Sequence, residues 1–175
     1  MSPRLEGLRW AALGFAAGAL AACGFTPLYG GDGGAGVQQR MNAVAVGIIP
    51  DRTGQMLREA LQTQLDGGSA PEQELYVLSV SYSIATEGIG VQPDTSTSRN
   101  RFIATATWSL APIGDPDRPL AQGHASTEDA ANIIDQQYFA LSLETDTVNQ
   151  HLADEIAGQI STQLAAYFKT HPGNA

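Results

Sequence analysis

Positive charge and cysteine are both scarce in this 175-residue sequence. Nine Lys and Arg residues stand against 18 Asp and Glu residues, so the formal net charge at pH 7 is -9. Because proteins that bind DNA or RNA need a basic surface, this balance excludes a general nucleic-acid binder. The single cysteine, Cys23, excludes an internal disulfide framework and a cysteine-rich metal site.

Catalytic and metal-binding motifs are also missing from the sequence. It contains neither a Gly-x-Ser-x-Gly nucleophile turn nor a Gly-x-x-x-x-Gly-Lys phosphate loop. Its three histidines, His124, His151 and His171, do not have the spacing of metal ligands. We interpret Asp154 and Glu155, which follow His151 closely, as part of an acidic helix surface. The sequence therefore predicts no metal, no cofactor and no enzymatic activity.

The first 22 residues differ in composition from the rest of the chain. A short start with two arginines and one glutamate is net positive, and 13 uncharged residues follow from Trp10 to Ala22. A membrane-spanning helix needs about 20 apolar residues, so this run is too short to span a bilayer. The basic start, the short apolar run and the small residues at its end predict a cleaved signal peptide over residues 1–22.

The end of this segment, Leu20-Ala21-Ala22-Cys23, resembles the lipobox of bacterial lipoproteins. The resemblance implies cleavage before Cys23, a thioether-linked diacylglycerol on its sulfur and an acyl chain on its amine. Several acyl chains hold a protein on a bilayer far better than one chain does. Gly24 stands where an inner-membrane retention signal has Asp, which implies delivery to the outer membrane. The alternative is a chance cysteine in an ordinary signal peptide, which would leave an unpaired thiol in an exported protein.

Residues 23–41 are predicted to form the lipidated N-terminus and a flexible linker. Residues 30–36 read GGDGGAG, and five glycines in seven positions favour a segment without a core. Residues 42–171 are predicted to form one folded domain, because 43% of the sequence is apolar and the length suits a single core. Residues 172–175 are a short tail.

Hydrophobic periodicity predicts the first elements of this domain. Residues 42–50 are apolar and β-branched, which is typical of a buried strand. Residues 51–66 have leucines every four residues and are followed by two glycines, which predicts a helix with Asp51 as its N-cap. Residues 74–86 alternate between apolar residues and serines, which predicts a long strand with one buried face.

The second half of the domain continues with two strands and a helix. Residues 93–100 are polar and predict a long loop, and residues 101–110 alternate as a strand. Residues 112–119 predict a turn, and residues 120–127 a weaker strand antiparallel to the one before it. A helix over about 145–169 is indicated by an apolar stripe with a spacing of four: Val148, Leu152, Ile156, Ile160, Leu164 and Phe168.

The predicted element order is β-α-β-β-β-α. It indicates an α+β fold in which two helices pack on one face of a four-stranded mixed sheet. The first helix would join two parallel strands by a right-handed crossover.

Three arginines are the candidate ligand-binding residues of a chain that has few cations. Arg99 and Arg101 flank the start of the third strand, and Arg118 lies in the turn at its far end. Arginines at loop tips can bind phosphate or carboxylate groups bidentately. The alternative is that they only supply solubilising charge. Trp108 and Tyr82 are interpreted as core residues rather than as platforms for a ligand.

The predicted mature start resembles the CGF-x-PLY opening of the LptE family of lipopolysaccharide-assembly lipoproteins. Further features of that family follow in order through most of the remaining chain: V-x-V-x-x-I-P at residues 44–50, a helix opening with Arg52 and Gly54-Gln55, Leu57-Arg58-x-x-Leu61, the long alternating strand, the polar loop and a closing helix that ends Tyr167-Phe168. The heptapeptide Cys23-Gly24-Phe25-Thr26-Pro27-Leu28-Tyr29 carries most of the specificity.

The resemblance implies a non-enzymatic outer-membrane lipoprotein. LptE proteins sit inside the lumen of the outer-membrane β-barrel protein LptD, as its plug and assembly partner, and the two form the translocon that delivers lipopolysaccharide to the outer leaflet. The implied partners are an LptD-like barrel, lipopolysaccharide and, through the acyl chains on Cys23, the membrane. The implied location is the outer membrane, facing the periplasm or inside the barrel lumen.

Lipopolysaccharide is anionic and the chain has a net charge of -9, so binding would have to be local. Arg99, Arg101 and Arg118 are the candidate contacts, and charge reversal at the first two is predicted to weaken binding. Two other interpretations remain open. One is a lipid-anchored periplasmic module for another ligand or protein. The other is a lipid-anchored hydrolase with a catalytic site that the sequence does not reveal.

Overall fold

A computed structural model describes residues 32–66, 73–91, 97–132 and 138–172, which form three helices and a four-stranded sheet. The elements are, in chain order, α2 (Asp32–Asn42), β1 (Val44–Val46), α3 (Asp51–Leu65), β2 (Tyr76–Val91), β3 (Thr97–Pro112), β4 (Ala121–Asn132) and α4 (Tyr138–Thr170). The predicted α+β class is confirmed, and so is the element order from β1 onward. One helix, α2, was not predicted.

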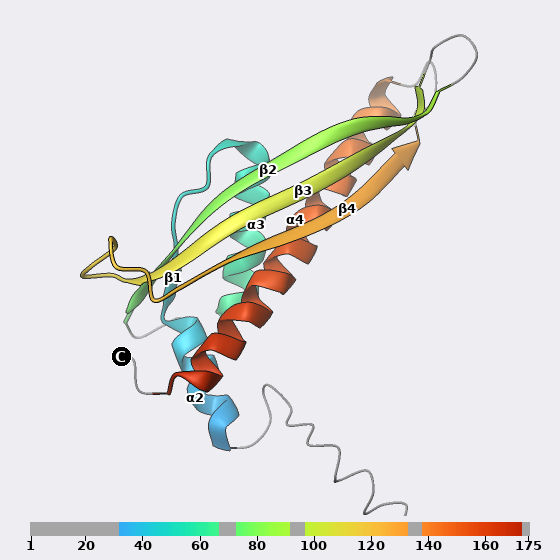
Figure 1. Cartoon of the computed structure of the whole chain (residues 1–175). Helices are drawn as coiled ribbons and strands as arrows, with labels where there is room; N and C mark the ends of the chain where they lie inside the picture. The colour runs from blue at the N-terminus through green and yellow to red at the C-terminus, as the bar shows by residue number, and fades with distance from the viewer. Residues whose placement is uncertain (1–31, 67–72, 92–96, 133–137, 173–175) are drawn as a thin grey trace, which may run out of the picture.

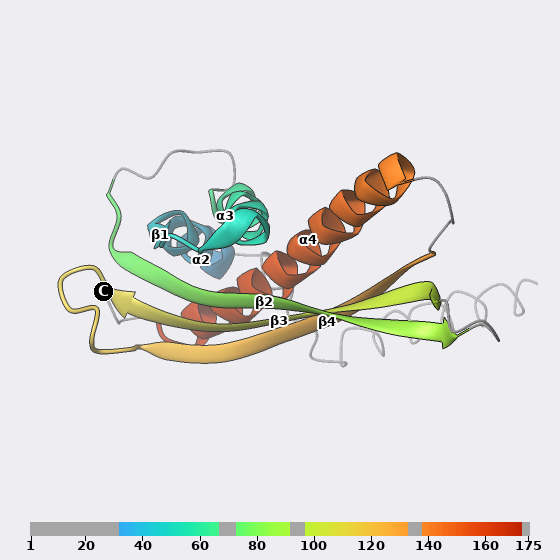
Figure 2. The same ribbon diagram turned by 90° about the horizontal axis from the view of Figure 1, so that it is seen from above.

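The four strands lie side by side in chain order and form a mixed sheet. β1 is parallel to β2, whereas β2, β3 and β4 are successively antiparallel. The three long strands make a twisted ribbon, and all three helices lie on the same side of it (Figure 1, Figure 2). We call that side of the sheet the inner face and the opposite side the outer face. The predicted layout, with helices on one face, is confirmed.

Alternation along the strands decides which side chains the helices cover. On β2 and β3 the large apolar residues alternate with serine and threonine, as the predicted strands required. The inner face buries Tyr76, Leu78, Val80, Phe102, Ala104, Ala106, Trp108 and Leu110. The outer face exposes Ser79, Ser81, Ser83, Thr105 and Thr107. One polar and one apolar face follow from the period of two in a strand.

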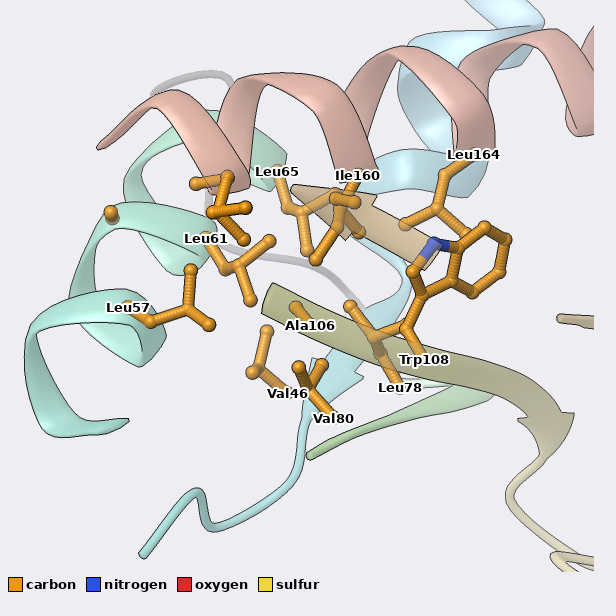
Figure 3. Packing of buried hydrophobic residues seen from close by; sticks show 14 of the residues in the cluster. Val46, Leu57, Leu61, Leu65, Leu78, Val80, Ala106, Trp108, Ile160 and Leu164 are labelled. Atoms are coloured by element: carbon orange, nitrogen blue, oxygen red, sulfur yellow. The ribbon is translucent and has the colours of Figure 1, made fainter. Parts of the chain in front are cut away.

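Helix α4 packs through the predicted stripe, whose six residues are all buried. A spacing of four advances about 40° beyond each full turn, so the stripe winds around the helix. Successive turns therefore meet different elements, and α4 contacts α2, α3, β3 and β4. In Figure 3 the α3 leucines and Ile160 of α4 meet above Leu78 and Ala106 of the sheet.

Helix α2 corrects the prediction of a flexible linker through residue 41, because residues 32–41 are helical. Glycine lowers helix propensity by about 1 kcal/mol relative to alanine. Tertiary packing outweighs that cost here, since Val37 and Met41 are 2% and 1% exposed and belong to the core. Residues 30 and 31, the start of the glycine-rich run, lie outside the described residues.

The start of α3 also differs from its prediction. Asp51 is the first helical residue rather than the N-cap, and Pro50 precedes it without any side-chain cap hydrogen bond. Asp51 has a φ of 68°, a left-handed conformation that costs a non-glycine residue about 1–2 kcal/mol. This conformation occurs at the first residue of α3, directly after the segment 47–50 that connects β1 to the helix. The Asp51 carboxylate lies in the first turn, where the helix dipole favours it.

Strand lengths differ from the predicted ones in both directions. β1 has three residues instead of the nine predicted over 42–50. β2 and β3 are longer than predicted, and residues 97–100, predicted as loop, pair with β2. A long partner strand extends pairing into polar sequence, because each added pair only continues an existing ladder. The rest of the predicted loop, and the two glycines after α3, lie outside the described residues.

Candidate functional site

The predicted lipidation site, Cys23, lies outside the described residues, so its modification remains a prediction. In the part of the chain that the structure describes, no helix combines the length and apolar character needed to cross a membrane. The same residues contain no cluster of three or more His, Cys, Asp or Glu side chains that could hold a metal ion. The described candidate residues are the three arginines.

The structure brings Arg99 and Arg101 together near the start of β3. They are two residues apart on one strand, so both side chains project from the same face. Arg101 lies directly opposite Glu87 on β2, and Arg99 opposite Ile89. Both arginines line one shallow pocket of about 240 Å³, whose other side is formed by Glu128, Asp129 and Ala130.

Arg101 is engaged by two carboxylates within the sheet. One guanidinium nitrogen lies 2.6 Å from Glu87 Oε2, and another lies 3.9 Å from Glu128 Oε2. The hydrogen bond that Arg101 donates to Glu87 raises the pKa of Arg101 above its ordinary value. Nε of Arg101 is buried and has no hydrogen-bond partner. The positive charge of Arg101 is therefore largely balanced before any ligand arrives.

Arg99 differs from Arg101 in its surroundings. Its side chain is exposed, and it forms no ion pair with any described residue. Counting described partners only, the pocket presents one guanidinium that is ion-paired and one that is not, beside two carboxylates. An anionic group bound there would depend mainly on Arg99, and the neighbouring acids would limit its affinity.

Arg118 does not join the other two arginines. It is exposed in the turn between β3 and β4, where its backbone N–H donates to the carbonyl oxygen of Asp115 at 3.2 Å. β3 continues for 11 residues between Arg101 and Pro112, or about 36 Å at 3.3 Å per residue. The three predicted contact residues therefore form two sites at opposite ends of the sheet.

A histidine links α4 to β4 next to the arginine pocket. Nδ1 of His151 lies 3.0 Å from Asp129 Oδ2, and Nε2 lies 3.5 Å from Glu155 Oε1. The hydrogen bond with Asp129 raises the pKa of His151, and the same bond lowers the pKa of Asp129. Thr127 of β4 also donates a hydrogen bond to Glu155. These contacts fasten the middle of α4 to the sheet.

This link predicts a pH window for stability. The contribution of His151 is complete below its ordinary pKa of 6.5 and is lost as the pH rises through the raised value. The contribution of Asp129 is complete above its ordinary value of 3.8 and is lost as the pH falls through the lowered one. We therefore expect His151→Ala to destabilise the protein most between pH 3.8 and 6.5.

The measurement is the unfolding midpoint of wild type and variant at a series of pH values. His124→Ala is the matched control, because His124 is exposed on the outer face of β4. A His151→Ala effect that is no larger between pH 3.8 and 6.5 than outside this window would show that the ion pairs do not contribute.

Two glutamines of α4 bind the free edge of β4. The Gln159 side chain accepts from the backbone N–H of Ser126 at 3.3 Å and donates to its carbonyl oxygen at 3.0 Å. Nε2 of Gln163 donates to the carbonyl oxygen of His124 at 3.0 Å, and its Oε1 accepts from the indole of Trp108. These amides satisfy backbone groups that a neighbouring strand would otherwise pair.

Trp108 and Tyr82 have different outcomes as predicted core residues. Trp108 is 5% exposed and lies in the core, as predicted. Tyr82 is only half-buried and packs against the core from its margin. Burial raises the pKa of Tyr82 to about 12, and its hydroxyl has no hydrogen-bond partner.

Sequence reasoning did not find the carboxylates around Arg101 or the two edge-binding glutamines. Glu87 becomes visible only once the register of β2 and β3 is known, because 14 residues separate it from Arg101. Nothing in the sequence distinguishes Gln159 and Gln163 from other polar residues on a helix.

The sequence profile of the LptE family, described as lipopolysaccharide-assembly, matches residues 41–164. That is well over half of the 175-residue chain. No curated protein sequence matches the chain.

Solved structures share the fold at low sequence identity. A candidate lipoprotein from Caulobacter crescentus CB15 is 22% identical with a TM-score of 0.61, over 76% of this chain and 96% of that one. The minor lipoprotein of Acinetobacter baumannii is 16% identical with a TM-score of 0.56, over 70% and 90%. Lipoprotein B of Nitrosomonas europaea is 13% identical with a TM-score of 0.54, over 73% and 87%.

These structures agree with the described fold, and the family profile spans the segment from the end of α2 into the last turns of α4. The chain therefore belongs to the LptE family of lipopolysaccharide-assembly proteins.

Proposed function

We propose that this protein is a non-enzymatic lipoprotein of the outer membrane that plugs an LptD-like β-barrel, helps to assemble it and assists lipopolysaccharide delivery to the outer leaflet. The observation that carries the proposal is the family match over residues 41–164, which assigns the chain to lipopolysaccharide assembly. The acyl chains predicted on Cys23 would hold the protein at the membrane. The proposal requires no cofactor, no metal and no catalytic residue.

The outer face of the sheet supports the plug role. Its middle carries exposed hydroxyl side chains in adjacent strands, such as Ser83 opposite Thr105, whose oxygens lie 3.1 Å apart. The interiors of outer-membrane barrels are polar, in contrast to their lipid-facing walls. A surface of serine and threonine can exchange hydrogen bonds with such a wall without burying uncompensated charge.

The test of the proposal is purification of the tagged, full-length protein from its native envelope in mild detergent, followed by mass spectrometry. We expect a large outer-membrane β-barrel protein in stoichiometric amount. Recovery of the protein alone, or with a different partner, would contradict the plug role. The family assignment would stand in either case.

Lipopolysaccharide contact is proposed at the pocket of Arg99 and Arg101. Reversing Arg101 would place a third carboxylate between Glu87 and Glu128, so reversing Arg99 alone tests binding without disturbing that ion-pair network. We expect Arg99→Glu to weaken lipopolysaccharide binding by roughly 2–5-fold, the size of one exposed charged contact. Binding is measured with the purified protein by a direct equilibrium assay.

Arg118→Glu is the matched comparison, because it makes the same charge change at the opposite end of the sheet. A smaller effect at Arg118 than at Arg99 would favour local contact at the pocket. Equal effects would indicate that lipopolysaccharide responds to net charge only. Unchanged binding for Arg99→Glu would remove the pocket from the proposal.

A further inference from the structure

The two edges of the sheet differ in how far their backbone groups are hydrogen-bonded to other described parts of the chain. Along β4, the amides of Gln159 and Gln163 bind the outward backbone groups of Ser126 and His124. Asp129 accepts a hydrogen bond from the backbone N–H of Ala130 at 2.7 Å. Proteins commonly cover edge strands in this way, because open backbone groups would otherwise pair with another chain.

Among the described residues, the opposite edge, along β2, has no such cover for most of its length. β1 pairs only with Tyr76, Val77 and Leu78. The last bond of that ladder runs from the N–H of Gly47 to the carbonyl oxygen of Leu78, at 2.9 Å. The chain then turns away into α3, and β2 continues well beyond β1 and α3 (Figure 2). No other described strand pairs with this edge.

The register shows which backbone groups face the open edge. Tyr76 donates its N–H to the carbonyl oxygen of Ala43, and the carbonyl oxygen of Leu78 accepts from Gly47. The backbone N–H and C=O groups of even-numbered β2 residues therefore point toward the β1 side. The odd-numbered residues address β3, because alternate residues of a strand direct their backbone groups to opposite edges. The open edge therefore presents the N–H and C=O groups of Val80, Tyr82, Ile84, Thr86 and Gly88.

The side chains along this edge define what would fit beside it. Tyr82 and Ile84 project from the inner face, are half-buried and pack against the core. The outer face continues with Ser81 and Ser83, which are exposed. An added strand would complete both surfaces if its apolar side chains faced inward and its polar side chains faced outward.

We propose that an extended segment of the β-barrel partner adds to the edge of β2 as a fifth strand, an inference that rests on the proposed function. A row of backbone donors and acceptors is complemented by another backbone, which lipopolysaccharide does not supply. A second copy of this chain is disfavoured, because two chains of net charge -9 repel each other. Every strand of a closed barrel wall is already paired with its neighbours. The added segment must therefore belong to a part of the partner other than the wall.

The first test is amide hydrogen exchange at single-residue resolution, on the native complex and on the purified protein alone. Complex formation should slow exchange at the even-numbered amides of residues 80–88 by at least 10-fold. The odd-numbered amides between them should change little, since they already bond to β3. This alternation distinguishes strand addition from general shielding by a nearby surface.

The second test is a proline at Thr86, which is exposed and directs its N–H to the open edge. Proline there removes one donor to the added strand and leaves the bonds to β3 in place. Thr86→Pro should reduce recovery of the barrel partner by about 10-fold, whereas Thr86→Ala should retain it. Both variants must unfold at temperatures close to wild type for the comparison to hold; otherwise the exchange pattern of the wild-type complex decides.

The outcomes separate the two proposals. Alternating protection together with a recovered barrel protein supports both. A recovered barrel without alternating protection overturns the added strand and leaves the plug role intact. Protection that arises from a second copy, or from residues 1–31 of the same chain, overturns the assigned occupant. Recovery of the protein without a barrel overturns both proposals.

Discussion

Phe168→Ala should destabilise the protein by about 3–5 kcal/mol, the usual cost of removing a buried aromatic side chain. Phe168 is 1% exposed near the end of α4 and packs against elements far apart in sequence. Its ring centroid lies 5.2 Å from that of Tyr76 on β2, and the guanidinium of Arg40 on α2 lies 5.6 Å from it. Truncation would therefore open a cavity where α2, α4 and the sheet meet.

The measurement is thermal or denaturant unfolding of the purified protein. A loss of this size should lower the midpoint by roughly 10 °C for a chain of this length. Phe168→Leu is the matched control, because it keeps most of the buried volume, and its cost should be no more than about half as large. A small effect of alanine would mean that α2 and the end of α4 do not pack cooperatively with the rest of the core.

The position of Phe168 shows how far periodicity alone can predict packing. The spacing of four from Val148 to Phe168 predicted a buried stripe, and every member is buried. The same stripe could not show that its last residue meets α2. The glycine-rich start of that helix has low intrinsic propensity, so no local signal indicated a helix there. Tertiary packing of Val37 and Met41 stabilises this helix, and a single sequence does not reveal such contacts.

Strand positions were predictable for a similar reason, and strand ends were not. Alternation identified the middles of β2 and β3, because one face had to be apolar. Their ends contain few apolar residues, so pairing through residues 97–100 left no pattern to read. The prediction for β1 was wrong in the opposite direction, because the strand is shorter than predicted. Its apolar sequence continues to Ile49, but pairing stops where the chain turns into α3.

The candidate site was predictable only as a set of residue types. Scarce arginines at strand ends suggested Arg99, Arg101 and Arg118, and the structure divides them between the two ends of the sheet. Their electrostatic states depend on register, which places Glu87 opposite Arg101. The open edge of β2 is likewise a property of topology. A sequence pattern predicts a strand, but it does not tell which of its backbone groups remain without a neighbour.

Gly54→Val should destabilise the protein by about 3 kcal/mol, although valine has a better intrinsic helix propensity than glycine. Gly54 is buried in the first turn of α3, directly after the Asp51 turn. A Cβ atom at this position would lie 2.8 Å from Cγ2 of Ile49 and 2.9 Å from the Ile49 carbonyl oxygen. The methyl group could rotate away, but the carbonyl belongs to the backbone that enters the helix.

Gly158→Val in α4 is the matched control for this prediction. The nearest atom to a Cβ there is Oε1 of Gln64, at 3.9 Å, so the position accepts a side chain in ordinary contact. The same substitution should change stability by no more than about 0.5 kcal/mol, since only propensity differs. Equal losses at both positions would attribute the effect to valine in a helix. A loss confined to Gly54 would show that close approach of the Ile49 backbone requires glycine at the entry to α3.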